Sequence, residues 1–145
     1  MEHCLGSKFL INDQLRSSDE FSEFKEFTGF SIYEIIRIES KIPLFFEDHL
    51  QRLYHSLELE GLSIRESDHQ LKDQVLRLIS NNSFTFGKIM IVVNFHHYPQ
   101  NPSYNLILYF TTYSFPGSYQ YKYGVKTILC KAVRSDPNAK VLNTK

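Results

Sequence analysis

The chain has 145 residues, and its 16 lysines and arginines balance 16 aspartates and glutamates, so the formal net charge at pH 7 is zero. This balance gives no electrostatic reason to expect binding to nucleic acid or to a membrane surface. No apolar run is long enough to cross a bilayer, and the N-terminus has no signal-peptide pattern. The two cysteines, Cys4 and Cys130, lie far apart in the sequence, which fits a reducing compartment, so we expect a cytoplasmic protein.

The N-terminal quarter contains one short apolar run followed by a polar stretch. Residues 8–12 have the composition of a strand that ends at Asn12-Asp13. The following residues, 17–26, are polar and irregular, and we expect Phe21, Phe24 and Phe27 to hold this region against the core.

Residues 31–61 predict a hairpin followed by an amphipathic helix. Residues 31–38 are rich in isoleucine and alternate as a strand does, with Tyr33, Ile35 and Arg37 on one face and Ile32, Glu34, Ile36 and Ile38 on the other. Residues 42–46 form a second apolar run close behind, as in a hairpin. Leucines 50, 53 and 57 then repeat at helical spacing, and Gly61 stands where a C-terminal cap is expected.

The second half of the chain adds one more helix and three strands to this pattern. Ser67 or Asp68 is a suitable cap for a helix whose apolar face is Leu71, Val75, Leu76 and Ile79. Apolar runs at 88–95, 104–113 and 125–133 predict strands, the first of them covered on both faces, and Cys130 is expected as a small core residue of the last. The fold class is therefore α+β: a mostly antiparallel sheet with two flanking helices.

A polar stripe accompanies the leucines of the first helix. His49, Arg52 and Ser56 are spaced so that they lie beside the apolar stripe, facing the margin of the sheet. Taken alone, an arginine and a histidine on such a helix are more often a solvated edge than a binding site.

The segment YEIIRIESKIPLFFEDHLQRLYHSLELEGL resembles the N-terminal signature of the fold-type IV pyridoxal-phosphate enzymes. This class contains the branched-chain and D-amino-acid aminotransferases and the aminodeoxychorismate lyases. The resemblance rests on Tyr33-Glu34, on Arg37 three positions later, and on His49-Leu50-Gln51-Arg52-Leu53 at the start of the helix. Near the chain end, Asn138-Ala139-Lys140-Val141-Leu142-Asn143 is similar to the segment that carries the Schiff-base lysine.

The resemblance implies a site for pyridoxal 5'-phosphate and a role for each of five residues. Lys140 would be the catalytic residue and the covalent anchor of the cofactor. Arg52 would bind the phosphate with support from His49, and Tyr33 would face both cofactor and substrate. Arg37 would read a substrate carboxylate, although an outward-facing strand charge is an equally good interpretation of this residue. Lys140 would be an ordinary surface lysine outside this setting, and Lys145 is a nearby competitor.

Two further motifs give negative expectations. His96 and His97 look like a metal-binding pair, but adjacent residues of an extended chain point in opposite directions and no ligand stands at suitable spacing, so no metal site is expected. Residues 94–97 also lack the arginine that reads the substrate carboxylate in some members of the class, which disfavours a trap of that type.

The resemblance also implies a domain organisation. Residues 1–137 would form the N-terminal domain and residues 138–145 the start of the interdomain segment, with the C-terminal domain absent. Such a chain would act weakly or not at all on an amino acid or aminodeoxychorismate-like substrate, and the choice between aminotransferase and lyase stays open. The alternatives are one half of a split enzyme, paired with a separate C-terminal half, and a non-catalytic binding or dimerisation module. A homodimer is expected.

Overall fold

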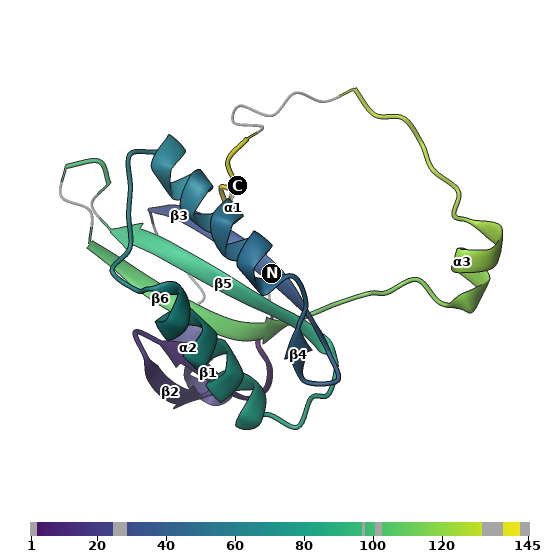
Figure 1. Cartoon of the computed structure of the whole chain (residues 1–145), viewed down its shortest axis with the longest axis horizontal. Coiled ribbons are helices and arrows are strands. Elements are labelled where there is room, and N and C mark those ends of the chain that lie inside the picture. The colour runs from purple at the N-terminus through teal and green to yellow at the C-terminus, as the bar shows by residue number, and fades with distance from the viewer. Residues whose placement is uncertain (1–2, 25–28, 97, 101–102, 132–137, 143–145) are drawn as a thin grey trace.

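The computed structural model describes residues 3–24, 29–96, 98–100, 103–131 and 138–142. Its centre is a six-stranded antiparallel sheet in the order β2-β1-β6-β5-β3-β4, which confirms the predicted α+β class (Figure 1). The strands are β1 Leu5–Ile11, β2 Gln14–Ser17, β3 Phe30–Glu39, β4 Ile42–Pro43, β5 Gly87–His96 and β6 Ser103–Thr111. The helices are the 3-10 helix η1 Ser18–Glu23 and the α-helices α1 Phe46–Leu59, α2 Asp68–Ser80 and α3 Ser118–Tyr123.

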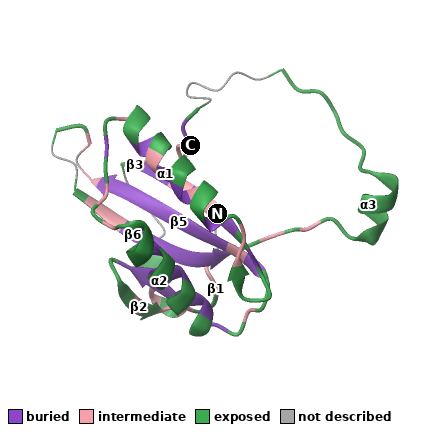
Figure 2. Ribbon diagram, viewed as in Figure 1, coloured by how far each residue is buried: buried purple, intermediate pink, exposed green. Residues whose placement is uncertain are grey.

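Helices α1 and α2 lie on one face of the sheet, and the main core is between them and the strands (Figure 2). The predicted alternation of β3 holds, because Ile32, Ile36 and Ile38 are buried on the helix side. The opposite face carries a smaller cluster around Phe9, Met90 and Tyr109, in which Tyr33 and Ile35 of β3 are partly buried. β5 is covered on both faces, as the continuous apolar run predicted.

The N-terminal phenylalanines pin the polar stretch as expected. Phe21 is buried in η1 against Phe9, and Phe24 also packs against Phe9. Phe27 lies outside the described residues. No helix in the described part of the chain has the length and apolar character needed to cross a bilayer.

The second strand of the hairpin is much shorter than predicted. Pairing with β3 ends at Pro43, and helix α1 begins already at Phe46. Phe45 has a φ of 51°, a left-handed backbone conformation that ends the extended strand and turns the chain into the helix. Because β4 pairs only with Ile38 and Glu39, the N-terminal half of the same β3 edge is left for another segment.

Helix α1 ends as the sequence predicted. Gly61 has a φ of 67°, and its N–H donates to the carbonyl of Glu58 while the N–H of Leu62 donates to that of Leu57. These two bonds define a Schellman cap, in which glycine carries no steric penalty for the left-handed conformation.

The apolar face of α2 differs from the prediction by one residue. Leu71, Val75, Leu78 and Ile79 are buried, whereas the predicted Leu76 is 40% exposed. Position 78 continues the stripe of 71 and 75 by one helical turn, and position 76 lies outside that stripe. Leu78, not Leu76, therefore belongs to the core.

The pair Leu76 and Leu78 offers a matched test of this packing. We expect Leu78→Ala to lower the free energy of unfolding by about 2–5 kcal/mol, because a fully buried leucine leaves a cavity. Leu76→Ala removes the same atoms from an exposed position and should cost within about 1 kcal/mol. Urea unfolding followed by circular dichroism measures both values, and equal losses would contradict the observed helix face.

The predicted strand at 125–133 is wrong for residues 125–131, which form no regular structure. This segment is part of an arm, residues 112–131, that leaves the sheet after β6, carries the unpredicted helix α3 and stands away from the domain (Figure 1). Ile128 and Leu129 are both exposed, so no neighbouring strand of the described chain covers either side of the run. Cys130 is exposed too, contrary to the expected core position; residues 132–133 lie outside the described residues.

The two cysteines should therefore differ sharply in reactivity. Burial raises the pKa of the Cys4 thiol to about 11, so little of the reactive thiolate is present at pH 8. Cys130 is exposed on the arm and should react first with a thiol reagent such as iodoacetamide. Peptide mass spectrometry after timed alkylation at pH 8 and pH 10 measures this order. Cys4 should gain reactivity with pH, and faster labelling of Cys4 than of Cys130 at pH 8 would contradict the structure.

Candidate cofactor site

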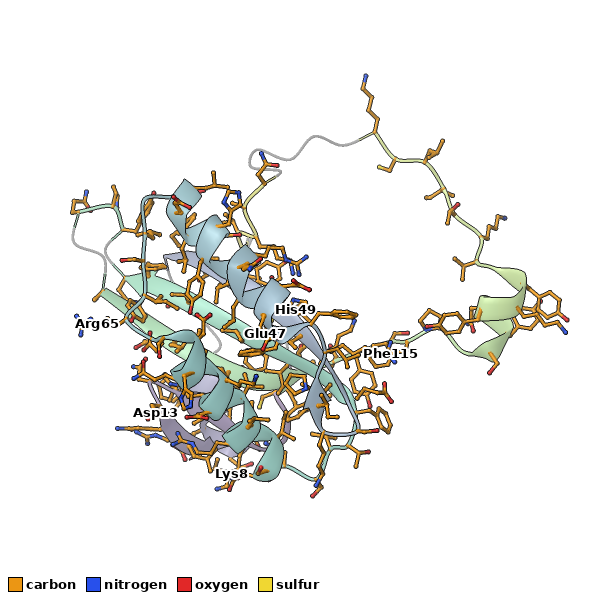
Figure 3. The ribbon with its side chains drawn as sticks, viewed as in Figure 1. Lys8, Asp13, Glu47, His49, Arg65 and Phe115 are labelled. Atoms are coloured by element: carbon orange, nitrogen blue, oxygen red, sulfur yellow. The ribbon has the colours of Figure 1, made fainter. Side chains whose placement is uncertain are left out.

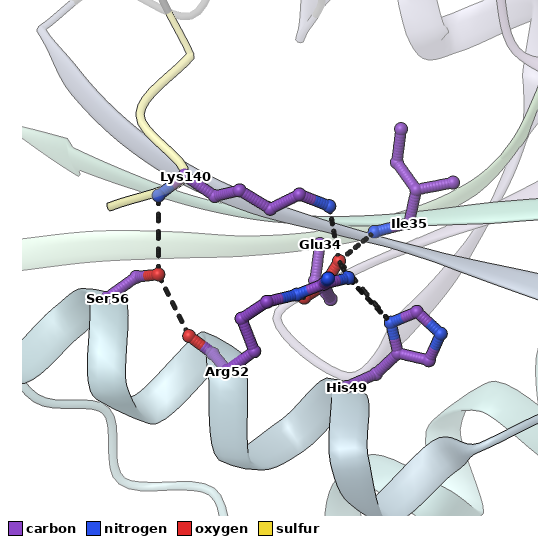
Figure 4. Close-up of polar contacts among 6 residues, drawn as sticks. All are labelled: Glu34, Ile35, His49, Arg52, Ser56 and Lys140. Atoms are coloured by element: carbon purple, nitrogen blue, oxygen red, sulfur yellow. Dashed lines mark hydrogen bonds and ion pairs between the residues drawn. The ribbon is translucent and has the colours of Figure 1, made fainter. Parts of the chain in front are cut away.

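A buried carboxylate, Glu34 of β3, is the centre of the polar cluster between the sheet edge and α1 (Figure 4). Its Oε2 accepts from Arg52 Nε at 2.6 Å, and its Oε1 accepts from Arg52 Nη2 at 2.8 Å. Oε1 also accepts from Lys140 Nζ at 2.6 Å and from the N–H of Ile35 at 2.8 Å. One carboxylate thus binds two cations from distant parts of the sequence.

Helix α1 places its polar stripe against this carboxylate because its leucines face the sheet. Leu50, Leu53 and Leu57 are buried in the core, so the neighbouring stripe lies at the β3 edge, as the spacing predicted. His49 Nδ1 lies 3.1 Å from Arg52 Nη2 and 3.4 Å from Glu34 Oε1. Since a guanidinium can only donate, Nδ1 of His49 accepts from Arg52 when it carries no proton and donates to Glu34 when it carries one.

Lys140 reaches the cluster through backbone pairing with β3. Val141 forms an antiparallel bridge with Ile32. The N–H of Tyr33 donates to the carbonyl of Lys140 at 3.0 Å, and the N–H of Leu142 donates to the carbonyl of Ser31 at 2.8 Å. These bonds use the part of the β3 edge that β4 does not cover, so the sheet itself positions the lysine.

Ser56 joins the lysine segment to α1. Its buried hydroxyl accepts from the N–H of Lys140 at 3.3 Å and donates to the carbonyl of Arg52 at 2.8 Å. The backbone of Lys140 is therefore held from two sides, by the strand and by the helix, while its side chain extends to Glu34.

The charges around Glu34 decide its protonation. Burial alone raises the pKa of the carboxyl group, but hydrogen bonds from His49, Arg52, Lys140 and the Ile35 N–H outweigh burial. They hold the pKa of Glu34 well below its ordinary value, so the carboxylate stays ionised at neutral pH.

The structure brings together four of the five residues singled out from the sequence. Arg52, His49 and Lys140 meet at Glu34, and the Tyr33 ring centroid lies 5.1 Å from Lys140 Nζ, within cation–π distance. Arg37 lies on the Tyr33 face of β3 but is engaged elsewhere: it donates to Glu39 at 2.8 Å, and its guanidinium lies 4.4 Å from the ring centroid of Phe115. Phe115 stands at the start of the arm (Figure 3). Lys145 lies outside the described residues, as does the proposed boundary at residue 137.

The sequence alone predicted no role for Glu34 or Ser56. The sequence did contain a sign of this role, because Glu34 shares its strand face with Ile32 and Ile36, which are buried. A carboxylate on a buried face needs charged partners. Ser56 was placed on the correct stripe, but its bond to Lys140 depends on a residue 84 positions away.

A separate cleft of about 590 Å³ lies between the 61–66 loop and the ends of several strands. Its lining includes Arg65, Glu66 and Tyr104, and it contains none of the residues that surround Glu34. We locate the candidate site by its chemistry, because the Glu34 cluster combines a primary amine, a guanidinium and an imidazole and the cleft does not. Among the described residues, no group of three metal-ligating side chains lies close enough together to hold a metal ion.

The chain is similar to proteins of one known family. The family model for amino-transferase class IV matches residues 31–145. A D-alanine aminotransferase of Bacillus licheniformis is 30% identical over 115 residues, which cover 75% of this chain and 41% of that protein. The branched-chain amino acid aminotransferase of Escherichia coli superposes with a TM-score of 0.76 at 18% identity, over 94% of this chain and 52% of that one.

A second branched-chain amino acid aminotransferase, the T.th. protein solved with pyridoxamine 5'-phosphate, has a TM-score of 0.59 at 15% identity and covers 74% of this chain and 40% of that one. The chain belongs to the class IV aminotransferases, which are pyridoxal-phosphate-dependent enzymes. It spans between two fifths and about half of the length of these relatives.

The residues present fit such a cofactor. Arg52 and Lys140 carry two positive charges against the single charge of Glu34, so the cluster retains a net positive charge that favours an anionic group such as a phosphate. The Arg52 side chain is 50% exposed, which leaves donors of its guanidinium available after the bidentate contact with Glu34. Lys140 supplies a primary amine on a side chain that is 27% exposed and can be reached from outside the cluster.

The buried carboxylate should make folding stability depend on pH. Because the pKa of Glu34 is lower in the folded than in the unfolded chain, its ionised form stabilises the fold at neutral pH, and this contribution falls as pH drops below about 5. We expect Glu34→Gln to reduce the free energy of unfolding at pH 7 by about 1.5–3 kcal/mol. The gap between wild type and variant should shrink by about 1–2 kcal/mol at pH 3.

Urea titrations at both pH values measure this gap. Glu39→Gln is the matched control, since it removes a carboxylate from the same strand whose side chain is 48% exposed. A constant gap for Glu34→Gln across the pH range would show that the carboxylate is not the stabilising group.

Proposed function

We propose that this chain holds pyridoxal 5'-phosphate through Lys140 and takes part in class IV amino transfer or lyase chemistry on an amino acid-like substrate. The observation that carries the proposal is the convergence of Lys140, Arg52 and His49 on one buried carboxylate, from the chain end and from α1. A backbone bridge, a contact with Ser56 and a buried counter-charge together hold Lys140, which distinguishes it from an ordinary surface lysine.

The chemistry of each side chain at the site determines the role that we propose for it. When bound, the cofactor supplies an aldehyde carbon that reacts with amines and a ring that withdraws electrons from the substrate. Lys140 would provide the amine that anchors the cofactor and a base at the same position. Arg52 binds the phosphate through donors that Glu34 leaves free, and His49 steadies Arg52 from the preceding turn of α1. Tyr33 places its ring beside the Lys140 amine.

Arg37 is proposed to bind a substrate carboxylate, and its position limits which part of the substrate it can contact. It lies four residues from Tyr33 on the same strand face, which places the two about 13 Å apart along the strand. A substrate carboxylate would have to compete with Glu39, which now accepts the Arg37 hydrogen bond. Arg37 therefore suits the outer end of a substrate, away from the Lys140 amine.

The relatives support an amino acid as the substrate class. The relatives named above are a D-alanine aminotransferase and branched-chain amino acid aminotransferases, and the name of each gives an amino acid. The matched part covers 41% of the first of these proteins and 52% of the second, so about half or more of each lies outside it. We propose that full turnover needs the counterpart of that remainder, either in the same protein or as a separate half, in a cytoplasmic assembly that is a homodimer.

Covalent capture of the cofactor tests the proposal. Pyridoxal 5'-phosphate is added to the purified chain, the product is fixed with borohydride, and the modified peptide is located by mass spectrometry. We expect one cofactor per chain on the peptide containing Lys140, and a loss of at least about tenfold in labelling in Lys140→Ala, because the anchoring amine is gone.

Lys126→Ala is the matched control, because it removes an exposed lysine of the arm and should leave the labelling unchanged. Equal labelling in wild type and Lys140→Ala, or a principal product on Lys145, would overturn the assignment of Lys140. No labelling above that of free lysine would overturn cofactor binding by this chain.

A further inference from the structure

The two cations at Glu34 are held in unequal ways. Arg52 contacts both carboxylate oxygens, at 2.6 and 2.8 Å, whereas Lys140 contacts Oε1 alone, at 2.6 Å. Oε1 receives three hydrogen bonds, from Ile35, Arg52 and Lys140, and is the more crowded of the two oxygens. Withdrawal of the Lys140 amine would therefore leave Glu34 with a bidentate guanidinium and a backbone donor, and the buried charge would stay compensated.

We infer that Glu34 is a positioning residue that latches Lys140 in its charged form until the cofactor arrives, while it keeps Arg52 fixed throughout. The inference rests on the proposed function and adds to it a regulation of the same site. The latch would oppose unproductive reactions of the amine and would make the loading of the cofactor depend on release of the lysine from Glu34.

The chemistry of loading requires this release. An ammonium has no lone pair, so Nζ must first give up one proton to solvent before it attacks an aldehyde carbon. A carbon–nitrogen double bond then replaces the carbon–oxygen double bond, and the oxygen leaves as water with the two remaining protons of the amine. In the structure Nζ is instead engaged in an ion pair with Glu34, whose Oε1 accepts its hydrogen bond at 2.6 Å.

The charges of the groups that face Lys140 predict whether loss of Glu34 raises or lowers the reactivity of the Lys140 amine. From β3 these are the Glu34 carboxylate and the Tyr33 ring, and from α1 they are Arg52 and His49. The carboxylate and the face of the ring attract the Lys140 ammonium, and the guanidinium repels it. Replacing Glu34 with glutamine leaves Lys140 beside a cation without its counter-charge, so the neutral, reactive amine should become more abundant.

Reductive methylation tests the latch without the cofactor. The full chain is treated with formaldehyde and cyanoborohydride at pH 7.5, and the initial rate at Lys140 is divided by the rate at the exposed Lys126 of the same molecule. We expect this ratio to rise about tenfold in Glu34→Gln, and to stay unchanged in the control Glu39→Gln. The difference should shrink as pH rises to about 11, because a lysine amine with the ordinary pKa of about 10.4 is then mostly neutral.

Three results would overturn the latch. The ratio could be the same in wild type and Glu34→Gln, or its increase could persist undiminished at the high pH, which would indicate better access and not a lost charge. If Glu34→Gln does not fold, Glu34→Asp decides: its shorter side chain should weaken the contact with Lys140 Nζ and raise the ratio, and an unchanged ratio would overturn the inference.

The outcome separates the latch from the proposed function. Formaldehyde has neither a phosphate nor a ring, so its reaction with Lys140 does not depend on a cofactor site. Failure of cofactor capture with a tenfold methylation effect would overturn the proposed function and keep a charged latch. Cofactor capture without a methylation effect would overturn the latch alone.

Discussion

The ion cluster at Glu34 is the interaction on which the rest of the site depends. A carboxylate with no exposed surface, among isoleucines, is tolerable in a folded chain only with charged hydrogen-bond partners. Its partners come from α1 and from residues 138–142, so the strand, the helix and the returning chain must all be in place together. The same requirement that makes the carboxylate costly to bury also gathers an amine and a guanidinium at one point.

The shape of the sheet explains why Lys140 arrives there. Strand β4 has only two residues, and it leaves the N-terminal half of the β3 edge with backbone groups that need partners. The segment around Val141 satisfies two of them, through the N–H of Tyr33 and the carbonyl of Ser31. A longer β4 would have occupied this edge and kept the lysine away from the helix.

Much of this arrangement can be predicted from the sequence, because local periodicity determines it. The alternation of β3 and the leucine stripe of α1 determine which faces are buried, and these in turn place His49 and Arg52 toward the sheet margin. The resemblance to class IV enzymes drew attention to Lys140, which no periodicity singles out. Glu34 is visible in the sequence as a charged residue on an apolar face, but its role depends on partners 18 and 106 positions away.

The errors also have physical causes. Residues 125–131 have the composition of a strand, yet composition does not supply a neighbour, and Ile128 and Leu129 are exposed on the arm. Leu76 was assigned to the core of α2 because it is apolar, although the helical stripe of Leu71 and Val75 continues through Leu78. In both places an apolar residue was taken as evidence of burial, whereas roughly 55–60% of the accessible surface of a folded protein is apolar.

Local contacts, and not packing of the exposed arm, hold Lys140 at the site. The described residues of the arm from Ser118 to Lys131 are exposed, so the arm adds little packing that could guide the lysine to its site. The cost of closing a long loop grows only slowly with its length, so a few local contacts can offset it. The backbone bridge at Val141, the Ser56 contact and the ion pair with Glu34 are those contacts. Lys140 is thus held by residues of β3 and α1, and not by packing of residues 118–131.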